Sequence, residues 1–397
     1  MTAIASDTGR LASRLVWWGG AWGLFFLLWP WIASDDTLAY AAARDAGAVL
    51  FVSIWMLCTA VLGGFGCTSG RLPRRALYTL AACVALAGLS RLWAADALAW
   101  SMALIRITSA ATVVAMTHAA LAARPDRIEG MVRSFVIGIA AAGTFMLAAW
   151  FVTGNDLAMV NRMTWTFAMP GSCGAVMMLA TVTAGCLLAD RLRDGSREAW
   201  ALLTVLCFTG ANLSLAGTRS CYVGTLAGAW VAALLLTEGR LRKALAWGGA
   251  IATVAAVTAV MLSIQQPDNR LTMMSSSWGA RLTFIGPSVR LWMDAPLWGH
   301  GAGQFAHAFS TALTPEVYLH RQVGAYLENP HCLPLQLLVE LGLAGLAGWA
   351  ATLIMGVSCA LGAWRAQTHH GRLGTAGALL AGQAALVADS LFNPASV

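Results

Sequence analysis

Long apolar segments alternate with short polar segments along the whole chain. A helix that crosses the hydrocarbon core of a bilayer needs about 20 mostly apolar residues. Eleven segments come close to this condition, so the sequence predicts an all-α polytopic membrane protein with about 11–12 transmembrane helices. The predicted spans are 15–33, 47–66, 76–94, 98–122, 134–153, 170–189, 199–216, 220–237, 244–264, 333–363 and 374–392.

The polar segments predict the orientation of these spans. If the N-terminus is cytoplasmic, sixteen basic residues fall in inside segments, seven in outside segments, and Arg91 and Arg106 within spans. This asymmetry is the one that the positive-inside rule describes. The first apolar stretch is longer than the hydrophobic core of a typical signal peptide, and more spans follow it. We therefore expect an uncleaved anchor.

Composition supports the same class of protein. Hydrophobic residues make up 58% of the 397 residues and charged residues 11%, whereas an ordinary soluble domain is about a quarter charged. These numbers exclude an intrinsically disordered chain and argue strongly against a soluble enzyme. The net charge is +7, but the basic residues are not gathered on a polar domain, so we expect no nucleic-acid partner.

One polar segment is much longer than the others. Residues 265–332 form an outside loop that carries four of the seven histidines and several apolar patches. A long loop in a compact protein is usually functional or disordered, and this one is too apolar for disorder. The sequence therefore divides into an N-terminal transmembrane bundle (1–264), a large outside loop (265–332) and C-terminal transmembrane helices (333–397).

Four arginines on the outer side are candidate ligands of an anion. Arg219 lies in a very short outer turn, where the topology rule disfavours a positive charge. Arg106 lies in the outer half of its span, where a charge is costly and usually faces a polar cavity or a partner. Together with Arg162 and Arg281 they would suit a phosphate or pyrophosphate, if they converge. The alternatives are a snorkelling Arg219 and separate local ion pairs for the others.

His331 is the candidate catalytic residue, because it lies where the long loop enters the span 333–363. Its unperturbed pKa lies near neutrality, so it can accept a proton from a hydroxyl group. A lone histidine is more often structural, and this alternative stays open. Cys332 beside it suggests a Cys/His nucleophile, but adjacent residues rarely point at each other. Glu340, within the span, would support a neighbour, pair with an arginine or serve helix packing.

The sequence offers little for a metal or a cofactor. The nine cysteines are scattered without a Cys-x-x-Cys pair, and the only adjacent acidic pair outside is Asp35–Asp36. A magnesium site generally needs carboxylates near the substrate phosphates. There is also no phosphate-binding P-loop. We therefore expect no metal, no cofactor and no direct use of ATP.

Three segments of the chain resemble the bacterial O-antigen ligases and related lipid-linked glycan polymerases. The most specific is His331–Gly342, which is similar to the family's His-Asn-x-x-Leu…Glu-x-Gly signature. The other two are the outer turn Ser214–Arg219, and Gly279–Arg281 followed by Asp294–Gly301, which resembles a loop arginine and a Pro-x-x-Gly-x-Gly turn. Cys332 stands where the family often has asparagine, so a supporting hydrogen bond would be absent. The family usually has about twelve spans, against eleven here, so a final span is missing or two are merged.

The resemblance implies a reaction in the bacterial inner membrane, at an active site that faces the periplasm. The donor would be a polysaccharide on undecaprenyl pyrophosphate, and the acceptor a sugar hydroxyl of lipid A–core. Arg219 and Arg281 would hold the pyrophosphate and stabilise the leaving group. His331 would be the general base of a direct, inverting, metal-independent attack.

Other functions fit the same residues. A polymerase that extends the lipid-linked polysaccharide, or a ligase that glycosylates a protein, differs only in the acceptor. A transporter of an anionic lipid or solute would use the arginines as its pathway. Paired broken helices would favour the transporter, and the sequence shows no such pairing. Loss of activity on chelation would instead indicate a metal-dependent glycosyltransferase.

Overall fold

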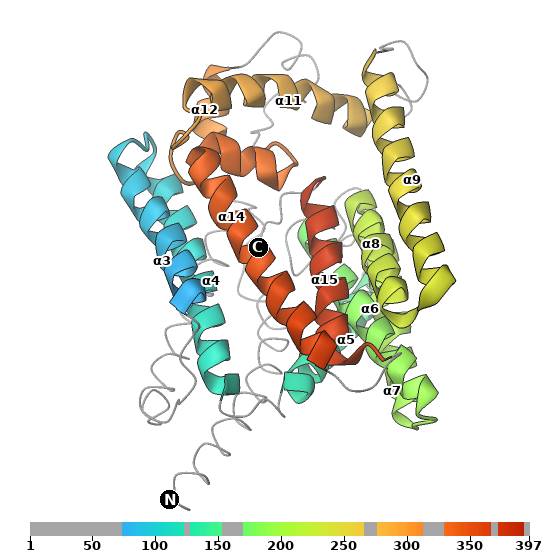
Figure 1. Cartoon of the computed structure of the whole chain (residues 1–397). Coiled ribbons are helices and arrows are strands. Elements are labelled where there is room, and N and C mark those ends of the chain that lie inside the picture. The colour runs from blue at the N-terminus through green and yellow to red at the C-terminus, as the bar shows by residue number, and fades with distance from the viewer. Residues whose placement is uncertain are drawn as a thin grey trace, which may run out of the picture.

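The computed structural model describes residues 74–122, 128–152, 170–265, 276–312, 329–366 and 372–392. Within these ranges the chain forms α-helices and one short 3-10 helix, with no strand, and most of the long helices stand side by side in one bundle (Figure 1). An all-α architecture is what the sequence predicts, because a helix satisfies its own backbone hydrogen bonds inside a membrane.

The first described part is a pair of antiparallel helices followed by a third. α3 spans Arg74–Leu89 and continues into the 3-10 helix η2, Ser90–Leu92; α4 spans Ala97–Ala122 and α5 spans Ile128–Val152. Asp96 caps the start of α4, because its Oδ1 accepts hydrogen bonds from the backbone N–H groups of Leu98 and Ala99 at 2.8 and 3.1 Å.

The core of the bundle lies between α6 (Pro170–Arg193), α7 (Glu198–Ala216), α8 (Arg219–Leu236) and the last helix, α15 (Gly374–Ser390). α9 (Gly239–Gln265) stands at its edge in Figure 1. Many of the buried residues are small, and small residues let transmembrane helices approach closely. Gly224 and Gly228 of α8 lie so near α15 that a Cβ on either would meet a backbone carbonyl, at 2.7 and 2.9 Å.

The predicted long loop forms helices of its own. α11 spans Ser276–Asp294 and lies across one end of the bundle, with the short α12, Phe305–Thr311, beside it (Figure 1). α14, Leu333–Ala366, begins at this end and crosses the bundle. Phe284, Phe305 and Phe309 are buried together and join α11 to α12. We call this end, which carries α11 and α12, the loop end.

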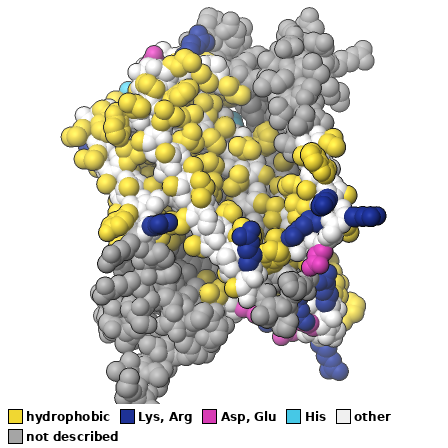
Figure 2. Space-filling view, viewed as in Figure 1, with side chains coloured by type: hydrophobic (Ala, Val, Ile, Leu, Met, Phe, Trp, Pro, Cys, Tyr) yellow, Lys and Arg dark blue, Asp and Glu magenta, His cyan; other side chains and the backbone are white. Residues whose placement is uncertain are grey.

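The opposite end, which we call the basic end, carries a network of ion pairs. Glu129 of α5 accepts from both Arg133, at 2.5 Å, and Arg191 of α6, at 2.7 Å. Glu198 of α7 also contacts both arginines. Figure 2 shows Lys and Arg side chains in the lower part of the visible face, below a mostly hydrophobic surface. Residues of several segments predicted to lie inside therefore meet at one end.

Each predicted span within the described residues coincides with a helix. The spans 15–33 and 47–66 lie outside the described residues. Five described helices are long and apolar enough to cross a membrane: they contain Arg75–Leu92, Cys173–Arg193, Glu198–Ala216, Arg219–Leu236 and Leu333–Ala366. The prediction of an all-α polytopic membrane protein is confirmed.

Candidate functional site

α14 is broken near its start, which the sequence pattern did not predict. Gly342 has φ 64° and ψ −159°. This conformation is not helical, and glycine adopts it more readily than any other residue. The predicted span 333–363 is longer than one crossing of a bilayer requires. The structure divides α14 at Gly342 into a short first segment and a long second one.

The turn 296–301 satisfies the backbone groups that this break sets free. The N–H groups of His300 and Gly301 donate to the carbonyls of Val339 and Glu340, at 2.9 and 2.7 Å. In the other direction, Leu343 N–H donates to the Pro296 carbonyl at 2.9 Å, and Ala344 N–H donates to the Leu297 carbonyl at 3.2 Å. Non-helical backbone at membrane depth needs such protein partners. The Pro-x-x-Gly-x-Gly turn and the break in α14 are therefore one structural unit.

The exchange of backbone hydrogen bonds between the turn 296–301 and α14 requires a glycine in each of the two segments. A Cβ at Gly299, where φ is 65°, would lie 2.4 Å from the backbone of Glu340. A Cβ at Gly342 would lie 2.4 Å from the backbone of Leu297. Both distances are far below van der Waals contact, so any larger residue would force the turn and the helix apart.

Glu340 of α14 also holds the loop that follows the turn 296–301, through hydrogen bonds to its carboxylate. Its side chain is buried, and its Oε2 accepts the backbone N–H of Gly303 at 2.9 Å, while Gln336 Nε2 donates to Oε1 at 2.9 Å. The backbone of Phe305 also bonds to this carboxylate, and Arg106 of α4 interacts with it electrostatically. The sequence left three roles open for Glu340: support of a neighbour, pairing with an arginine, and helix packing. These contacts are compatible with the first two, and the role of Glu340 stays a prediction.

Gln304 joins the loop to the hairpin of α3 and α4. Its buried side-chain amide exchanges two hydrogen bonds with the backbone of Asp96: Asp96 N–H donates to Oε1 at 2.7 Å, and Nε2 donates to the Asp96 carbonyl at 2.8 Å. Ala302 N–H donates to Ser90 Oγ at 3.0 Å. Sequence reasoning missed Gln304, because nothing in its local pattern indicates a partner two hundred residues away.

His331 lies just before α14 in a conformation that is rare for its type. It is the one non-glycine residue in the described part of the chain with a positive φ, at 55°. Asn329 holds it in place, because the Asn329 Oδ1 accepts the His331 backbone N–H at 3.2 Å. Strained backbone of this kind often occurs at functional sites. Asn329 was also missed, although an Asn two residues before a turn residue is a recognisable signal.

The other described histidines of the loop are placed differently. The imidazole Nε2 of His300 lies 2.9 Å from the carbonyl of Leu291, a contact in which the ring nitrogen must donate. His307 is exposed on α12. His331 is therefore the described loop histidine that combines an unusual backbone with a position at the start of a membrane helix.

Cys332, beside His331, is half-buried. Burial raises the pKa of its thiol above the ordinary value, and a bond with the Leu335 backbone opposes this shift only in part. The thiolate is the nucleophilic form of cysteine, so a raised pKa works against the Cys/His nucleophile considered from the sequence.

Arg219 is the first residue of α8, and its side chain is exposed. The turn before it ends α7 with Gly217 in a left-handed conformation, φ 61°, and Tyr222 Oη donates to the Ser214 carbonyl at 3.0 Å. Within the described part of the chain, no acidic side chain forms an ion pair with Arg219. A cation at a helix N-terminus is repelled by the positive end of the helix dipole. An anion bound there would be attracted both by the guanidinium group and by the helix dipole.

The other candidate arginines have different positions. Arg281 lies in α11 at the loop end, and Arg162 lies outside the described residues. Arg106 is nine residues into α4 and interacts with Glu340. Arg91 donates to the Ala94 carbonyl and lies 5.9 Å from the ring of Trp100. The convergence of the candidate arginines on one anion stays a prediction.

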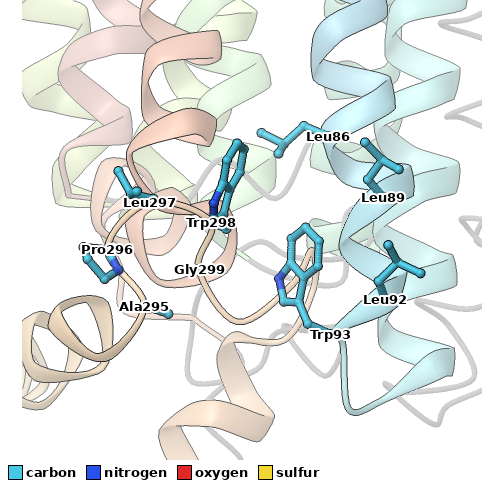
Figure 3. Close-up of a pocket in the computed structure, with 9 residues that line it drawn as sticks. All are labelled: Leu86, Leu89, Leu92, Trp93, Ala295, Pro296, Leu297, Trp298 and Gly299. Atoms are coloured by element: carbon cyan, nitrogen blue, oxygen red, sulfur yellow. The ribbon is translucent and has the colours of Figure 1, made fainter.

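An apolar groove of about 610 Å³ lies next to the turn 296–301. Its walls are the loop-end part of α3 with η2 on one side, and residues 295–299 on the other (Figure 3). Trp93 and Trp298 both extend into the space between these walls. Leu92 and Trp298 are 82% and 57% exposed, an exposure that suits contact with lipid. Among the described residues, no group of three or more acidic, His or Cys side chains could hold a metal ion.

Comparison with known proteins identifies the segment that contains most of these features. No curated protein matches the chain. Residues 202–350 match the family described as O-Antigen ligase. The match runs from α7 into α14 and so includes Arg219, Arg281, His331 and Glu340. The chain therefore contains a segment, residues 202–350, that is similar to the O-antigen ligase family.

Proposed function

We propose that this protein transfers a glycan from undecaprenyl pyrophosphate to a hydroxyl group of lipid A–core, in the bacterial inner membrane and on its periplasmic side. The observation that carries this proposal is the O-antigen ligase match over 202–350, a segment that holds both the exposed Arg219 turn and the strained His331. The basic end, with its predicted inside segments, lies opposite the loop end, which supports the periplasmic assignment.

In this proposal His331 is the general base. Asn329 fixes its backbone, and the start of α14 limits its freedom, so that its imidazole can meet the acceptor hydroxyl in one orientation. The base takes the hydroxyl proton while the oxygen attacks the anomeric carbon of the donor. The bond from that carbon to the pyrophosphate oxygen breaks, and the anomeric configuration is inverted, by analogy with single-displacement glycosidases.

Arg219 and Arg281 neutralise the leaving pyrophosphate. A guanidinium group offers paired N–H donors that match phosphate oxygens, and stabilising charge on the leaving group lowers the barrier without a metal. The exposure of Arg219 and its place at the start of α8 support this role. Arg162 would assist them. Arg106 interacts with Glu340, so its contribution would pass through the support of the loop.

The decisive experiment is a transfer assay with the purified full chain, undecaprenyl-pyrophosphate glycan, lipid A–core and excess chelator. We expect a heavier lipopolysaccharide product that still forms in the chelator. Longer lipid-linked glycan would indicate a polymerase instead, and glycan on an added protein would indicate a protein ligase. Loss of product only in the chelator would contradict the metal-independent mechanism.

Absence of all products with authentic donor and acceptor would favour the transporter. Among the described helices, α14 is the one with a non-helical residue inside it. A transporter of the inverted-repeat type places broken helices in matching positions of two halves. The described residues do not contain such a second break, so glycan transfer is the better supported function.

A further inference from the structure

The first turn of α8 has one exposed residue followed by two buried ones. Arg219 faces outward, whereas Ser220 and Cys221 are buried in the bundle. A helix turn is rigid, so the direction of the Arg219 side chain depends on how the buried face of the turn is held. The residues that contact Cys221 therefore bear on the orientation of the arginine.

Asp389 contacts this buried face from the last turn of α15. Its side chain is 1% exposed, and Cys221 Sγ donates to its Oδ1 at 3.4 Å. A buried carboxylate is costly, and ionisable residues inside a membrane domain are usually functional. Neither the sequence motifs nor the proposed mechanism gives Asp389 a task.

α8 packs closely against its neighbours around the contact of Cys221 with Asp389. A Cβ on Gly224 would lie 2.7 Å from the Ala385 carbonyl, so α8 and α15 touch within one turn of the Asp389 contact. On the other side, a Cβ on Gly174 of α6 would lie 2.8 Å from Cys221 Sγ. The start of α8 is thus held between α6 and α15, and Asp389 supplies a polar contact from α15.

We propose that Asp389 is a positioning residue, which acts through Cys221 to fix the direction in which Arg219 presents its guanidinium group to the lipid pyrophosphate. This inference rests on the proposed role of Arg219. It concerns orientation alone: Asp389 need not touch the substrate, and it exchanges no proton with it.

A double-mutant cycle tests the proposal. The full chain is prepared with Arg219→Ala, Asp389→Ala and both changes, and kcat and KM are measured for the undecaprenyl-pyrophosphate glycan at saturating lipid A–core. We expect Asp389→Ala to lower kcat/KM for the donor by about 10- to 100-fold, a typical effect of a misplaced binding group. The double variant should be no worse than Arg219→Ala alone, because both changes remove the same interaction.

Two conservative variants keep the test meaningful if Asp389→Ala folds poorly. Asp389→Asn keeps an acceptor oxygen and the shape of the side chain, and Cys221→Ser keeps a donor. Both should retain most of the donor kcat/KM, whereas Cys221→Ala should reproduce the loss. Equal losses in Cys221→Ser and Cys221→Ala would overturn the proposal.

The other end of α15 offers a matched control. Asp190 of α6 accepts the backbone N–H groups of Leu373 and Gly374, at 3.1 and 2.7 Å, and so caps α15 at the basic end. Asp190→Ala should lower the melting temperature and leave the donor kcat/KM of the folded protein unchanged. If Asp389→Ala behaves in the same way, its role is structural and the proposal is wrong.

The outcomes also separate this inference from the proposed function. If Arg219→Ala is fully active, the pyrophosphate role of Arg219 fails, and the positioning role of Asp389 fails with it. If Arg219→Ala is impaired and the effect of Asp389→Ala adds to it in full, only the positioning role fails.

Discussion

The two ends of the bundle differ in the main partners of their acidic side chains. At the basic end several carboxylates pair with arginines: Glu129 contacts Arg133 and Arg191, and Asp194 contacts Arg372. At the loop end the hydrogen bonds to acidic side chains come from other groups, although Glu340 also interacts electrostatically with Arg106. Asp96 caps α4, Glu340 accepts the backbone of the loop, and Asp389 accepts the thiol of Cys221.

This difference decides which arginines are available to a ligand. Arg133, Arg191 and Arg372 at the basic end are already paired with carboxylates, and partly exposed ion pairs of this kind contribute little to stability individually. They join the ends of helices, and in the predicted orientation they lie on the inner side of the membrane. At the loop end the carboxylates are used for architecture, and Arg219 is left exposed at the start of α8. An anionic substrate is therefore expected at the loop end.

The test with the largest expected effect changes His331 at the loop end. His331→Ala should reduce transfer by about 100- to 10,000-fold, the usual contribution of a general base. The matched control is His307→Ala, which removes an exposed histidine of the same loop and should leave transfer unchanged. Both are measured as initial rates at equal amounts of folded protein. An active His331→Ala variant with normal expression would remove the assignment of the base.

The second test compares arginines from the two ends. Arg219→Ala should lower kcat/KM for the pyrophosphate donor by about 100- to 1,000-fold, because it removes a charge that stabilises the leaving group. Arg219→Lys should recover part of this loss, since it keeps the charge but not the paired donors.

The control for Arg219 is Arg191→Ala at the basic end. Its ion pairs to Glu129 and Glu198 are partly exposed, so their loss should destabilise the fold by no more than about 1 kcal/mol and leave the donor kcat/KM unchanged. If Arg191→Ala lowers activity as strongly as Arg219→Ala, the two ends do not differ in the way argued above.

The regular part of the fold could be predicted from the sequence, because apolar length and arginine position are local signals. The span 199–216 corresponds to α7, and 374–392 begins where α15 begins. The break at Gly342 could not be predicted in the same way. Leu341-Gly342-Leu343 continues an apolar run, and its non-helical conformation depends on the turn 296–301, which comes from a distant part of the chain.

In the candidate site, too, some residues could be predicted from local sequence and others could not. His331, Glu340 and Arg219 stand in short motifs, so the sequence could single them out. Their supports do not: the bond from Cys221 to Asp389 joins residues 168 positions apart, and Gln304 bonds to Asp96 across 208 positions. Such contacts follow from helix packing and have no local pattern that one sequence could reveal.

A third test concerns the architecture of the loop end. Gly342→Ala would place a Cβ 2.4 Å from the Leu297 backbone in a residue with φ 64°. The strain alone costs about 1–3 kcal/mol, and the clash would separate the turn 296–301 from α14. We expect a lower melting temperature in detergent and reduced transfer. Gly362→Ala in the same helix is the control, because a Cβ there meets nothing within 4 Å. An unchanged Gly342→Ala protein would contradict the backbone exchange.

The smallest effect is expected at Cys332, beside the proposed base. Its raised pKa means that a smaller fraction is thiolate at any given pH than in a free cysteine, whose pKa is about 8.5. In a variant that keeps Cys332 as its single cysteine, alkylation by a water-soluble maleimide should be slow near neutrality. The rate should rise through a midpoint above that of the free amino acid. Cys332→Ser should retain transfer, because the hydroxyl attack leaves the thiol no covalent role. Fast alkylation at neutral pH, together with loss of transfer in Cys332→Ser, would instead indicate a thiolate nucleophile and a two-step reaction that retains the anomeric configuration.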